Sequence, residues 1–379
     1  MQKIKILIVV SNLEYGGAQR QIIELVNNIN TSRYKVDIAS LSDYVPLASQ
    51  LTSTETIVHI VHKQNKFDFS VVFKLMKLIK SEGYEILHSY LFDAEIASRL
   101  AARLSTSHPK VIGSERNTNY SIKKIQRSAY KLTRKMFEII IANSRSGADF
   151  NARELNISRE KYRVIYNGVN TKKFKPRPKT NLRRKLNVAD DAVLIGVFAS
   201  FKAQKNHEFL FDTLLEIDDL PSNVRILLVG DMLFGGMHGS DEYYDGILKR
   251  INETSLAPRC IFLGNRDDVE MLYPACNFTV LPSRFEGTPN VILESMACGI
   301  PVIATNVSDN ARIIEDEVSG LLVELDNKGE LKVALSKLMR DTSLVSTMGL
   351  ASRESIIEKF SSEMLAVNTS RVYDELTSE

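Results

Sequence analysis

The stretch from Phe278 to Ala304, FTVLPSRFEGTPNVILESMACGIPVIA, constrains the fold more than any other part of the chain. It begins with a short apolar run and a turn-rich loop. Thr288 followed by Pro289 fits a helix N-cap and first helical position. Gly299 and Pro301 end the helix before a second apolar run. Two strands joined through a helix lie parallel, so this unit predicts a parallel sheet with a ligand site at its carboxyl edge.

Two carboxylates mark the junction between the loop and the helix of this stretch. Glu286 lies just before the predicted cap, and Glu294 lies in the second turn of the helix. A helix N-terminus offers N–H donors and a positive dipole end, which suit phosphate. Carboxylates beside it can hold sugar or ribose hydroxyls. Either glutamate alone could equally be a capping or surface residue, so the combination carries the argument.

The segment EGTPNVILESMACGIPVIA resembles the Glu-x7-Glu signature of the retaining GT-B glycosyltransferases of family 4, also called group 1. The resemblance implies an α/β fold of the GT-B type, with two Rossmann-like doubly wound parallel-sheet domains that face a cleft. It also implies an enzyme of the hexosyltransferase type, which moves a sugar from a nucleotide-diphosphate donor to an acceptor.

Length and composition agree with such an enzyme. A chain of 379 residues should make about two domains of roughly 100–200 residues each. The net charge of +3 is too small to suggest a nucleic-acid partner. The three cysteines lack metal-ligand spacing and favour a reducing, cytoplasmic setting. No run approaches the ~18 apolar residues of a membrane span, and the first apolar run is too short for a signal peptide.

The first half of the chain alternates strand and helix patterns. Ile4–Val10 predicts a buried strand, after which Gly16 and Gly17 open a helix. The dinucleotide fingerprint G-x-G-x-x-G is absent, which argues against an oxidoreductase. The glycine pair could form only a left-handed turn. The family resemblance instead implies that Gly17 lies near the donor diphosphate and Gly16 near the acceptor.

Polar residues are predicted at the ends of three further strands, where doubly wound folds keep their sites. His88 is a candidate catalytic contact to the donor sugar or acceptor, with a satisfied, partly buried histidine as the alternative. Arg116 could meet phosphate or acceptor, or form a surface ion pair. Ser144 matches the family's Asn-Ser strand end. Family members carry further histidines after the His88 strand, where this chain has Tyr90 and Asp93.

A basic amphipathic helix is predicted over residues 121–136, SIKKIQRSAYKLTRKM. Its apolar stripe comprises Ile122, Ile125, Ala129, Leu132 and Met136. Two interpretations stay open. The stripe could face the core and leave a solvated basic face, or the helix could lie on an anionic membrane surface.

The domain boundary follows Asn167-Gly168, a strong turn signal that resembles the family's crossover segment. Residues 1–171 are predicted to form an acceptor-binding domain and 172–360 a donor-binding domain. The last helix, 361–379, is expected to pack back on the first domain, as GT-B chains usually do.

The loop after the first strand of the second domain reads SFKAQKNHE. Lys205 matches the family lysine that neutralises the donor diphosphate, since cations suit phosphate oxygens. Ser200 stands where the family has an arginine. Either Lys202 compensates for that loss, or Ser200 donates a hydrogen bond.

The resemblance assigns roles to the remaining positions. Glu286 and His88 are the predicted catalytic residues. The predicted diphosphate site comprises Lys205, Ser200, Gly17, Gly287 and Thr288. The predicted ribose and base site comprises Glu294, Arg266 and Asn290. The predicted acceptor or cleft residues are Gly16, Arg116 and Ser144. No Asp-x-Asp motif is present, so we expect neither a metal nor another cofactor.

The expected activity is a retaining transfer from a UDP-sugar, the commoner donor among relatives, to a glycan or lipid-linked sugar in envelope or surface polysaccharide synthesis. The expected location is the cytoplasm, including the inner face of the plasma membrane. One alternative is a nucleotide-diphosphate-sugar 2-epimerase of the same fold, which would need further acid/base groups. The other is a catalytically silent sugar-nucleotide-binding scaffold, which Glu286, Glu294 and Lys205 argue against and which Ser200 and Asp93 keep open.

Overall fold

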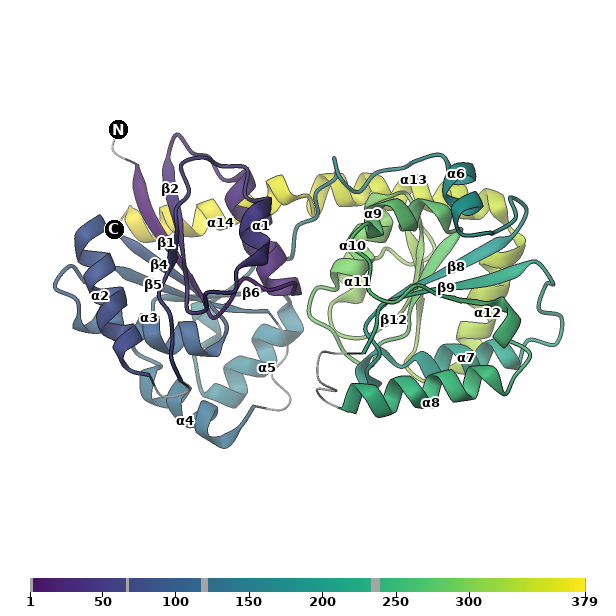
Figure 1. Ribbon diagram of the computed structural model, residues 1–379, viewed down its shortest axis with the longest axis horizontal. Coiled ribbons are helices and arrows are strands. Elements are labelled where there is room, and N and C mark those ends of the chain that lie inside the picture. Colours follow the sequence, from purple (N-terminus) through teal and green to yellow (C-terminus); the bar gives the residue numbers. More distant parts are fainter. Residues whose placement is uncertain (1–2, 66–67, 117–121, 233–238, 379) are drawn as a thin grey trace. The chain divides into compact units, whose positions relative to one another are not determined.

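The structure, a computed structural model, describes residues 3–65, 68–116, 122–232 and 239–378 (Figure 1). Its chain forms two compact units, Met1–Gly168 with Ser362–Glu379, and Val169–Ser361. The two points where the chain passes between units lie side by side. Val169 and Ser361 form a parallel bridge, and the Val169 N–H donates to the Phe360 carbonyl at 2.9 Å.

Unit 1 contains a seven-stranded parallel sheet in the order β3-β2-β1-β4-β5-β6-β7. Its strands are β1 (Ile4–Val10), β2 (Tyr34–Ser40), β3 (Val58–Ile60), β4 (Ile86–Tyr90), β5 (Lys110–Glu115), β6 (Ile139–Ala142) and β7 (Tyr162–Val164). Its α-helices are α1 (Gly17–Asn28), α2 (Ser70–Glu82), α3 (Phe92–Leu104), α4 (Lys124–Thr133), α5 (Arg145–Leu155) and α14 (Ser362–Thr377). Side chains of β1 alternate between two cores, one shared with α1 and α14 and the other with α2, α3 and α5.

Unit 2 contains a six-stranded parallel sheet in the order β10-β9-β8-β11-β12-β13. Its strands are β8 (Val193–Phe198), β9 (Val224–Val229), β10 (Cys260–Phe262), β11 (Phe278–Leu281), β12 (Val302–Thr305) and β13 (Gly320–Val323). Its α-helices are α6 (Lys179–Lys185), α7 (His207–Leu215), α8 (Ser240–Asn252), α9 (Val269–Leu272), α10 (Asn290–Ala297), α11 (Asn310–Ile313), α12 (Lys328–Arg340) and α13 (Thr342–Lys359). Helices α7, α8 and α12 share one core with the sheet, and α9 and α10 lie on its other side (Figure 1).

Both sheets share one topological feature. The first strand of each unit, β1 or β8, lies between the second strand and a strand that returns from the far side. Strand order therefore reverses beside β1 and beside β8, and such a switch point opens a crevice at the carboxyl ends of the strands. This arrangement confirms the predicted α/β class with two doubly wound parallel sheets.

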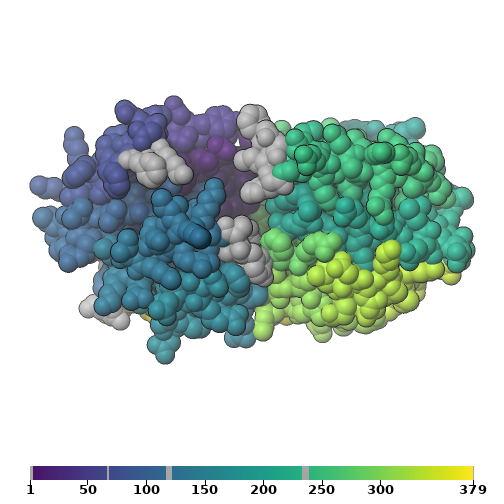
Figure 2. Space-filling view, turned by 90° about the horizontal axis from the view of Figure 1, so that it is seen from below, coloured from purple at the N-terminus to yellow at the C-terminus, as the bar shows by residue number. Residues whose placement is uncertain are grey.

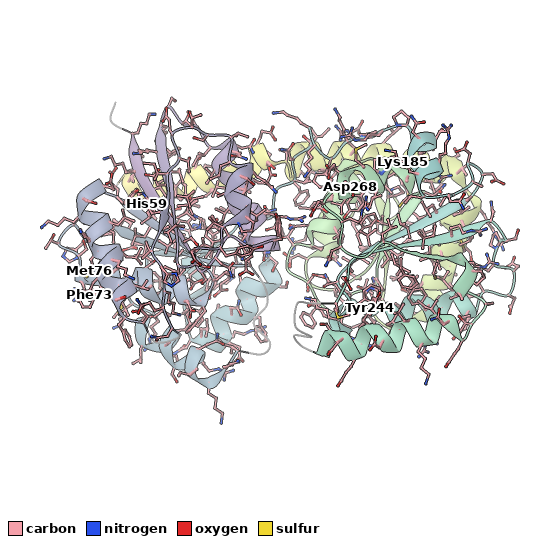
Figure 3. The ribbon with its side chains drawn as sticks, viewed as in Figure 1. His59, Phe73, Met76, Lys185, Tyr244 and Asp268 are labelled. Atoms are coloured by element: carbon pink, nitrogen blue, oxygen red, sulfur yellow. The ribbon has the colours of Figure 1, made fainter. Side chains whose placement is uncertain are left out.

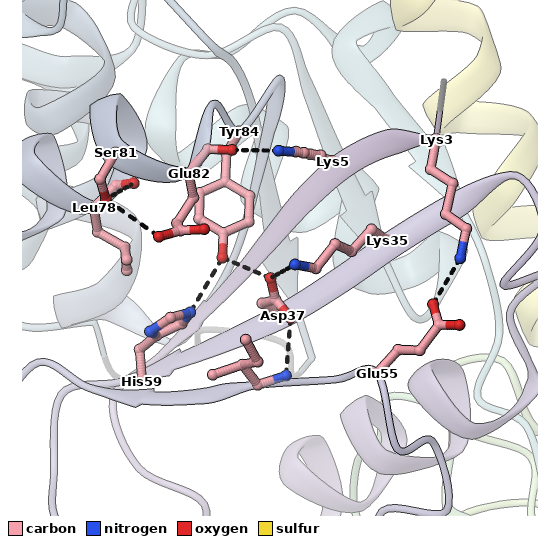
Figure 4. A network of polar contacts seen from close by, with 11 residues as sticks. Lys3, Lys5, Lys35, Asp37, Glu55, His59, Leu78, Ser81, Glu82 and Tyr84 are labelled. Atoms are coloured by element: carbon pink, nitrogen blue, oxygen red, sulfur yellow. Dashed lines mark hydrogen bonds and ion pairs between the residues drawn. The ribbon is translucent and has the colours of Figure 1, made fainter. Parts of the chain in front are cut away.

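A polar network joins the edge strand β3 to β2 and to Tyr84 within unit 1 (Figure 4). Its centre is Asp37 on β2, whose carboxylate accepts from the Tyr84 hydroxyl at 2.7 Å and from the Ile57 N–H at 2.8 Å. Lys35 lies 3.7 Å from the same carboxylate, and His59 Nε2 lies 3.2 Å from the Tyr84 oxygen. Because Asp37 is almost fully buried, these partners offset the cost of removing its charge from water.

A buried charge cluster lies beneath α4. Arg99 on α3 pairs with Glu95 at 2.9 Å and donates to the Thr133 hydroxyl of α4 at 3.1 Å. Its guanidinium lies 5.1 Å from the centroid of the Tyr130 ring. Burial raises the pKa of Glu95 to about 7 and that of Glu115, at the end of β5, to about 8. Within α4 only Tyr130 and Thr133 are buried, so this cluster is where the helix attaches to unit 1.

Two helical glycines of unit 2 differ in the room around them. Gly349 on α13 is buried, and a Cβ added there would lie 2.3 Å from the carbonyl oxygen of Gly299, in the turn after α10. Gly246 on α8 is exposed, and a Cβ there would meet nothing within 4 Å.

We predict opposite effects of the same substitution at these positions. Gly349→Ala should lower the free energy of unfolding by about 1–3 kcal/mol, because α13 must move away from the turn. Gly246→Ala should raise it by up to about 1 kcal/mol through helix propensity. Urea denaturation of both variants checks this. Equal stability of the two variants would show that α13 is not packed against the Gly299 turn.

Candidate functional site

The loops that follow β8 and β11 meet at the switch point of unit 2. These strands are neighbours and run parallel, with Phe278 opposite Ile195, so their following loops emerge at the same edge of the sheet. Lys205 Nζ and Glu286 Oε1 lie 2.6 Å apart, with side chains only 14% and 8% exposed. Both residues were predicted from the sequence, and the structure brings them into direct contact.

Further hydrogen bonds hold these two loops together. The side-chain amide of Gln204 donates to the Phe285 carbonyl at 2.7 Å, and the Arg284 N–H donates to the Gln204 carbonyl at 2.8 Å. On the other side, the Glu286 N–H donates to the Ser308 hydroxyl at 3.0 Å. Glu286 is therefore fixed by its own backbone as well as by Lys205.

The helix that follows Glu286 begins one residue later than predicted. Pro289, not Thr288, occupies the N-cap, and Asn290 is the first helical residue of α10. The N–H of Ile292 donates to the Pro289 carbonyl at 3.1 Å, which starts the helical ladder at that residue. Gly287 and the buried Thr288 thus lie in the loop directly before the helix, where N–H groups and the positive end of the dipole favour an anion.

Glu294 lies in the second turn of α10 and is 8% exposed. The hydroxyl of Tyr273 donates to its Oε2 atom at 2.9 Å. The Tyr273 ring stacks on Phe198, the last residue of β8, with ring centroids 3.8 Å apart. Tyr273 was not predicted as a site residue, because it lies outside the motif and no local pattern links it to Glu294.

Ser200 and Arg266, two other predicted donor-binding residues, make no contact with the Lys205–Glu286 pair among the hydrogen bonds and ion pairs of the described residues. Ser200 lies half-buried just after β8. Arg266 lies in the loop after β10, where both Nε and Nη2 donate to Asp268 at 2.8 Å (Asp268 is labelled in Figure 3). The pair is about half exposed, and Arg266 lowers the pKa of Asp268 through its hydrogen bond. A bidentate partner occupies the guanidinium of Arg266 in this state.

His88 does not occupy the predicted position at a strand end. β4 continues to Tyr90, so His88 lies in the middle of the strand and is 0% exposed. Its Nδ1 lies 2.7 Å from the Tyr373 hydroxyl of α14 and its Nε2 lies 2.8 Å from the Ser114 hydroxyl. Burial lowers its pKa to about 3. A neutral, fully bonded imidazole with no access to solvent argues against the predicted catalytic role.

Arg116 follows β5 and is partly buried. Its Nη2 donates to the Asn167 side chain at 2.7 Å, and its guanidinium lies 5.6 Å from the centroid of the Tyr90 ring. Within the described part of the chain, no carboxylate pairs with Arg116 and its Nε has no partner. The alternative of a surface ion pair is therefore not observed. Burial lowers the pKa of this guanidinium.

The remaining predicted residues of unit 1 begin helices. Ser144 is the N-cap of α5, where its hydroxyl accepts from the Gly147 N–H at 3.1 Å. Gly16 is the N-cap of α1, and Gly17 is the exposed first residue of that helix. Neither glycine has a positive φ, so the alternative of a left-handed turn is excluded. Tyr90 and Asp93 stand where family members carry histidines. The Tyr90 ring lies against the Arg116 guanidinium, and Asp93 pairs with Lys63 at 2.6 Å.

Two family models match the chain, one on each unit. Residues 15–173 match Glycosyltransferase Family 4, and residues 192–341 match glycosyl transferases group 1. The chain belongs to the group 1 glycosyltransferases of family 4. The predicted family is thereby confirmed, and with it the class of enzyme.

This glycosyltransferase is similar to proteins of known activity. It is 28% identical, over 77% of its length and 76% of the relative's, to UDP-Gal:alpha-D-GlcNAc-diphosphoundecaprenol alpha-1,3-galactosyltransferase of Escherichia coli. It is 24% identical, over 81% and 79%, to N-acetyl-alpha-D-glucosaminyl L-malate synthase of Bacillus anthracis. Its fold matches Anabaena Alr3699/HepE, solved in complex with UDP, with a TM-score of 0.85, 22% identity and coverage of 99% and 100%. This likeness confirms the GT-B architecture.

Membrane-spanning helices and metal-ligand clusters were both sought among the described residues of the glycosyltransferase. None of its described helices is both long enough and apolar enough to cross a membrane. Within the described ranges, no three His, Cys, Asp or Glu side chains are grouped as metal ligands would be.

A second buried histidine lies beside the candidate site. His207, the first residue of α7, is 1% exposed and stacks on Phe201 with ring centroids 4.5 Å apart. Tyr244 of α8 packs edge-on against the same Phe201 ring, with ring centroids 4.7 Å apart (Tyr244 is labelled in Figure 3). Neither nitrogen of His207 has a hydrogen-bond partner among the residues that the structure describes. Burial lowers its pKa to about 3, as it does for His88.

We predict that substitution by Phe changes the free energy of unfolding in opposite directions at His88 and His207. In the unfolded chain each histidine binds a proton below its pKa of about 6.5, whereas in the folded protein it stays neutral down to about pH 3. Each histidine therefore lowers the free energy of unfolding by about 1.4 kcal/mol for every pH unit below 6.5. Both variants should weaken this acid sensitivity. At pH 7, His207→Phe should stabilise by about 1–2 kcal/mol, because no hydrogen bond is lost. His88→Phe should destabilise by about 1–3 kcal/mol, because two buried hydroxyls lose their partner.

Urea denaturation between pH 4.5 and 7.5 measures both effects. A His207→Phe variant that is less stable than the parent protein at pH 7 would show that this imidazole does have a hydrogen-bond partner.

Proposed function

We propose that this glycosyltransferase transfers a sugar, with retention of anomeric configuration, from a UDP-sugar to a glycan or lipid-linked sugar used for envelope or surface polysaccharide. The observation that carries the proposal is the Lys205–Glu286 pair beside the N-terminus of α10, at the carboxyl ends of β8 and β11. The Escherichia coli relative, whose name gives a UDP-Gal donor and a diphosphoundecaprenol-linked acceptor, supports it. So does the UDP complex of the Anabaena structure.

In this proposal unit 2 binds the donor. Lys205 moves from Glu286 to the diphosphate, which also meets Gly287, Thr288 and the N-terminus of α10. Ser200 donates a further hydrogen bond. These groups stabilise the charge that develops on the leaving diphosphate. Glu286, released from Lys205, takes hydroxyls of the donor sugar.

Glu294 is proposed to bind the ribose hydroxyls. Its carboxylate accepts from the Tyr273 hydroxyl, and burial of the carboxylate strengthens each hydrogen bond that it would form with a ligand. Asn290, at the start of the same helix, would line the ribose side of the site. Arg266 would contact the base or its surroundings after leaving Asp268.

The proposed chemistry needs no covalent enzyme intermediate. The bond between the anomeric carbon and the diphosphate oxygen breaks, and the acceptor oxygen forms its bond on the same face. The acceptor proton passes to the departing phosphate, and Glu286 stabilises positive charge at the anomeric carbon. We propose that the reaction is independent of metal ions and other cofactors. Unit 1 is proposed to bind the acceptor, with Gly16, Arg116 and Ser144 lining its site.

We predict that one nucleotide stabilises the protein and that Glu294→Ala removes most of this effect. A ligand that binds only the folded state raises the unfolding temperature as its concentration exceeds its dissociation constant. Loss of charged hydrogen bonds to ribose should weaken binding by about 10–100-fold. Thermal-shift measurements with UDP, GDP and ADP test this, with Glu253→Ala on the exposed end of α8 as a control. No stabilisation of the parent protein at millimolar nucleotide would contradict the proposed donor site.

Helix α4, the predicted basic amphipathic helix, is exposed on the face drawn in Figure 2. The expectation of a core-facing apolar stripe is wrong for two of its members, since Ile125 is 56% and Leu132 80% exposed. Residue 121, where this helix was predicted to begin, lies outside the described residues. The exposed cations on and beside the helix are Lys123, Lys124, Arg127, Lys131, Arg134 and Lys135. Among described carboxylates only Glu154 pairs with one of them, Arg127.

We therefore propose that α4 lies on an anionic membrane surface, and by this contact on the inner face of the plasma membrane. Ile125→Ser with Leu132→Ser should weaken co-sedimentation with anionic phospholipid vesicles by about tenfold or more, because two apolar side chains no longer insert. The matched control is Val333→Ser with Leu350→Ser, two similarly exposed apolar residues of unit 2. Equal loss in both pairs, or equal binding to neutral vesicles, would contradict the proposal.

A further inference from the structure

A groove of about 420 Å³ lies in unit 2 between α13 and the segment that leads into α6 (Figure 1). Its volume is within the range of about 300–1,000 Å³ that small-molecule sites occupy. Asn277 and Ile300, which line the groove, lie just before β11 and β12. The groove therefore lies at the amino edge of the sheet, whereas Lys205 and Glu286 meet at the carboxyl edge. We call it the amino-edge groove.

The walls of the amino-edge groove are largely apolar. Pro274, Ile300 and Val345 line it and are buried, and Ile357 of α13 lines it while 47% exposed. Part of this apolar lining is thus in contact with water. A ligand that covers such a surface gains about 25 cal/mol for each Å² of apolar area that it removes from water.

Two cationic side chains of the same groove lack a counter-charge. Arg177 donates through Nη2 to the Lys173 carbonyl at 3.3 Å, and its buried Nε has no hydrogen-bond partner among the described residues. Lys179 is the partly buried first residue of α6, and within the described ranges its side chain forms no hydrogen bond or ion pair. Of the residues that line the groove, only Glu354 carries a carboxylate, and it pairs with neither cation.

The surroundings of Lys179 disfavour its charge. A cation in the first turn of a helix faces the positive end of the helix dipole. Burial lowers the pKa of Lys179, and repulsion from Arg183 on the same helix lowers it further. Arg353 of α13 is a third cation on the groove lining, and it donates to the Phe174 carbonyl at 3.3 Å. Three cations against one carboxylate leave an excess of positive charge, which a bound anion would offset.

We propose that the amino-edge groove binds a single-chain anionic amphiphile, that is, a hydrocarbon chain that ends in a phosphate or a carboxylate. Lys179 and Arg177 hold the charged end, and the chain covers the apolar wall at Val345 and Ile357. Because the Arg177 Nε is buried, the charged end has to enter the groove and cannot stay in the headgroup layer of a bilayer. The occupant is therefore a free amphiphile, and its site shares no residue with the proposed donor site.

Isothermal titration calorimetry of the full chain with octyl phosphate, inorganic phosphate and 1-octanol tests the proposal. The parent protein should bind octyl phosphate about tenfold or more tightly than either other compound, because only octyl phosphate meets both the cations and the apolar wall. If octyl phosphate does not bind, or binds no better than inorganic phosphate or 1-octanol, the proposal is overturned. UDP binding has no part in these outcomes, so they are independent of the proposed function.

Substitutions at Lys179 test the role of its charge. Lys179→Gln should weaken octyl phosphate binding by about tenfold and change 1-octanol binding by less than about twofold. Lys179→Arg should stay close to the parent protein, because it keeps the charge. Lys249→Gln, at an exposed lysine near the end of α8, is the matched control and should bind octyl phosphate normally. Unchanged binding of octyl phosphate to Lys179→Gln would overturn the proposal.

Unfolding of the ligand-free protein shows whether Lys179 has a structural role instead. Lys179→Gln should be at least as stable as the parent protein in urea, since it removes an ammonium without a partner. A clear loss of stability would show that the folded protein already balances this charge, and the proposal would fail.

A fluorescent reporter locates the bound amphiphile. The sequence contains no tryptophan, so Ile357→Trp places a single indole on the wall of the groove. Octyl phosphate should shift its emission to shorter wavelength, and the shift should be much smaller when Lys179→Gln is added. Unchanged emission at a saturating concentration of octyl phosphate would place the ligand elsewhere and overturn the proposal.

Co-sedimentation with anionic phospholipid vesicles separates a free amphiphile from a bilayer. Lys179→Gln should bind these vesicles as the parent protein does. A loss of vesicle binding by about tenfold would identify the bilayer as the occupant and overturn the proposal of a free amphiphile.

Discussion

The parallel pairing of β8 with β11 is the constraint on which the candidate site depends. Gly196 of β8 lies opposite Thr279 of β11, and it leaves no room for a side chain, because a Cβ there would lie 2.7 Å from Cys276 Sγ. This close register brings the two following loops to one edge of the sheet. Lys205 and Glu286, far apart in the sequence, become partners as a consequence. The start of α10 and the position of Glu294 on it then follow from the same loop.

Sequence patterns were sufficient where short-range rules decide the outcome. The alternation of strands and helices predicted two doubly wound sheets, and the rule that sites lie at carboxyl ends of parallel strands pointed to Arg116 and to the loop that carries Glu286. The resemblance to the family singled out Lys205. The position of the α10 cap was off by one residue. Thr288-Pro289 satisfies the usual cap preferences, but the first helical hydrogen bonds go to the Pro289 carbonyl.

Long-range packing decided the positions that the sequence could not predict. His88 looked like a strand-end residue until its partner, the Tyr373 hydroxyl of α14, placed it in the core. Tyr273 contacts Glu294 from outside the motif. The stripe on α4 has the spacing of a core-facing helix, yet the buried charge cluster selects Tyr130 as an anchor and leaves Leu132 outside. Periodicity identifies an amphipathic helix, but it does not say which face a neighbour will cover.

The return of α14 to unit 1 has a consequence for biosynthesis. Leu365, Val372, Tyr373 and Leu376 fill a core that is otherwise built from the first half of the chain. A ribosome makes these residues only after all of Val169–Ser361, which forms unit 2 from one continuous segment. The unit that is translated first therefore cannot complete its core first. Until the last helix emerges, the nascent first unit exposes the apolar groove that α14 will cover, and this makes it a candidate client for chaperones while the second unit is already folding.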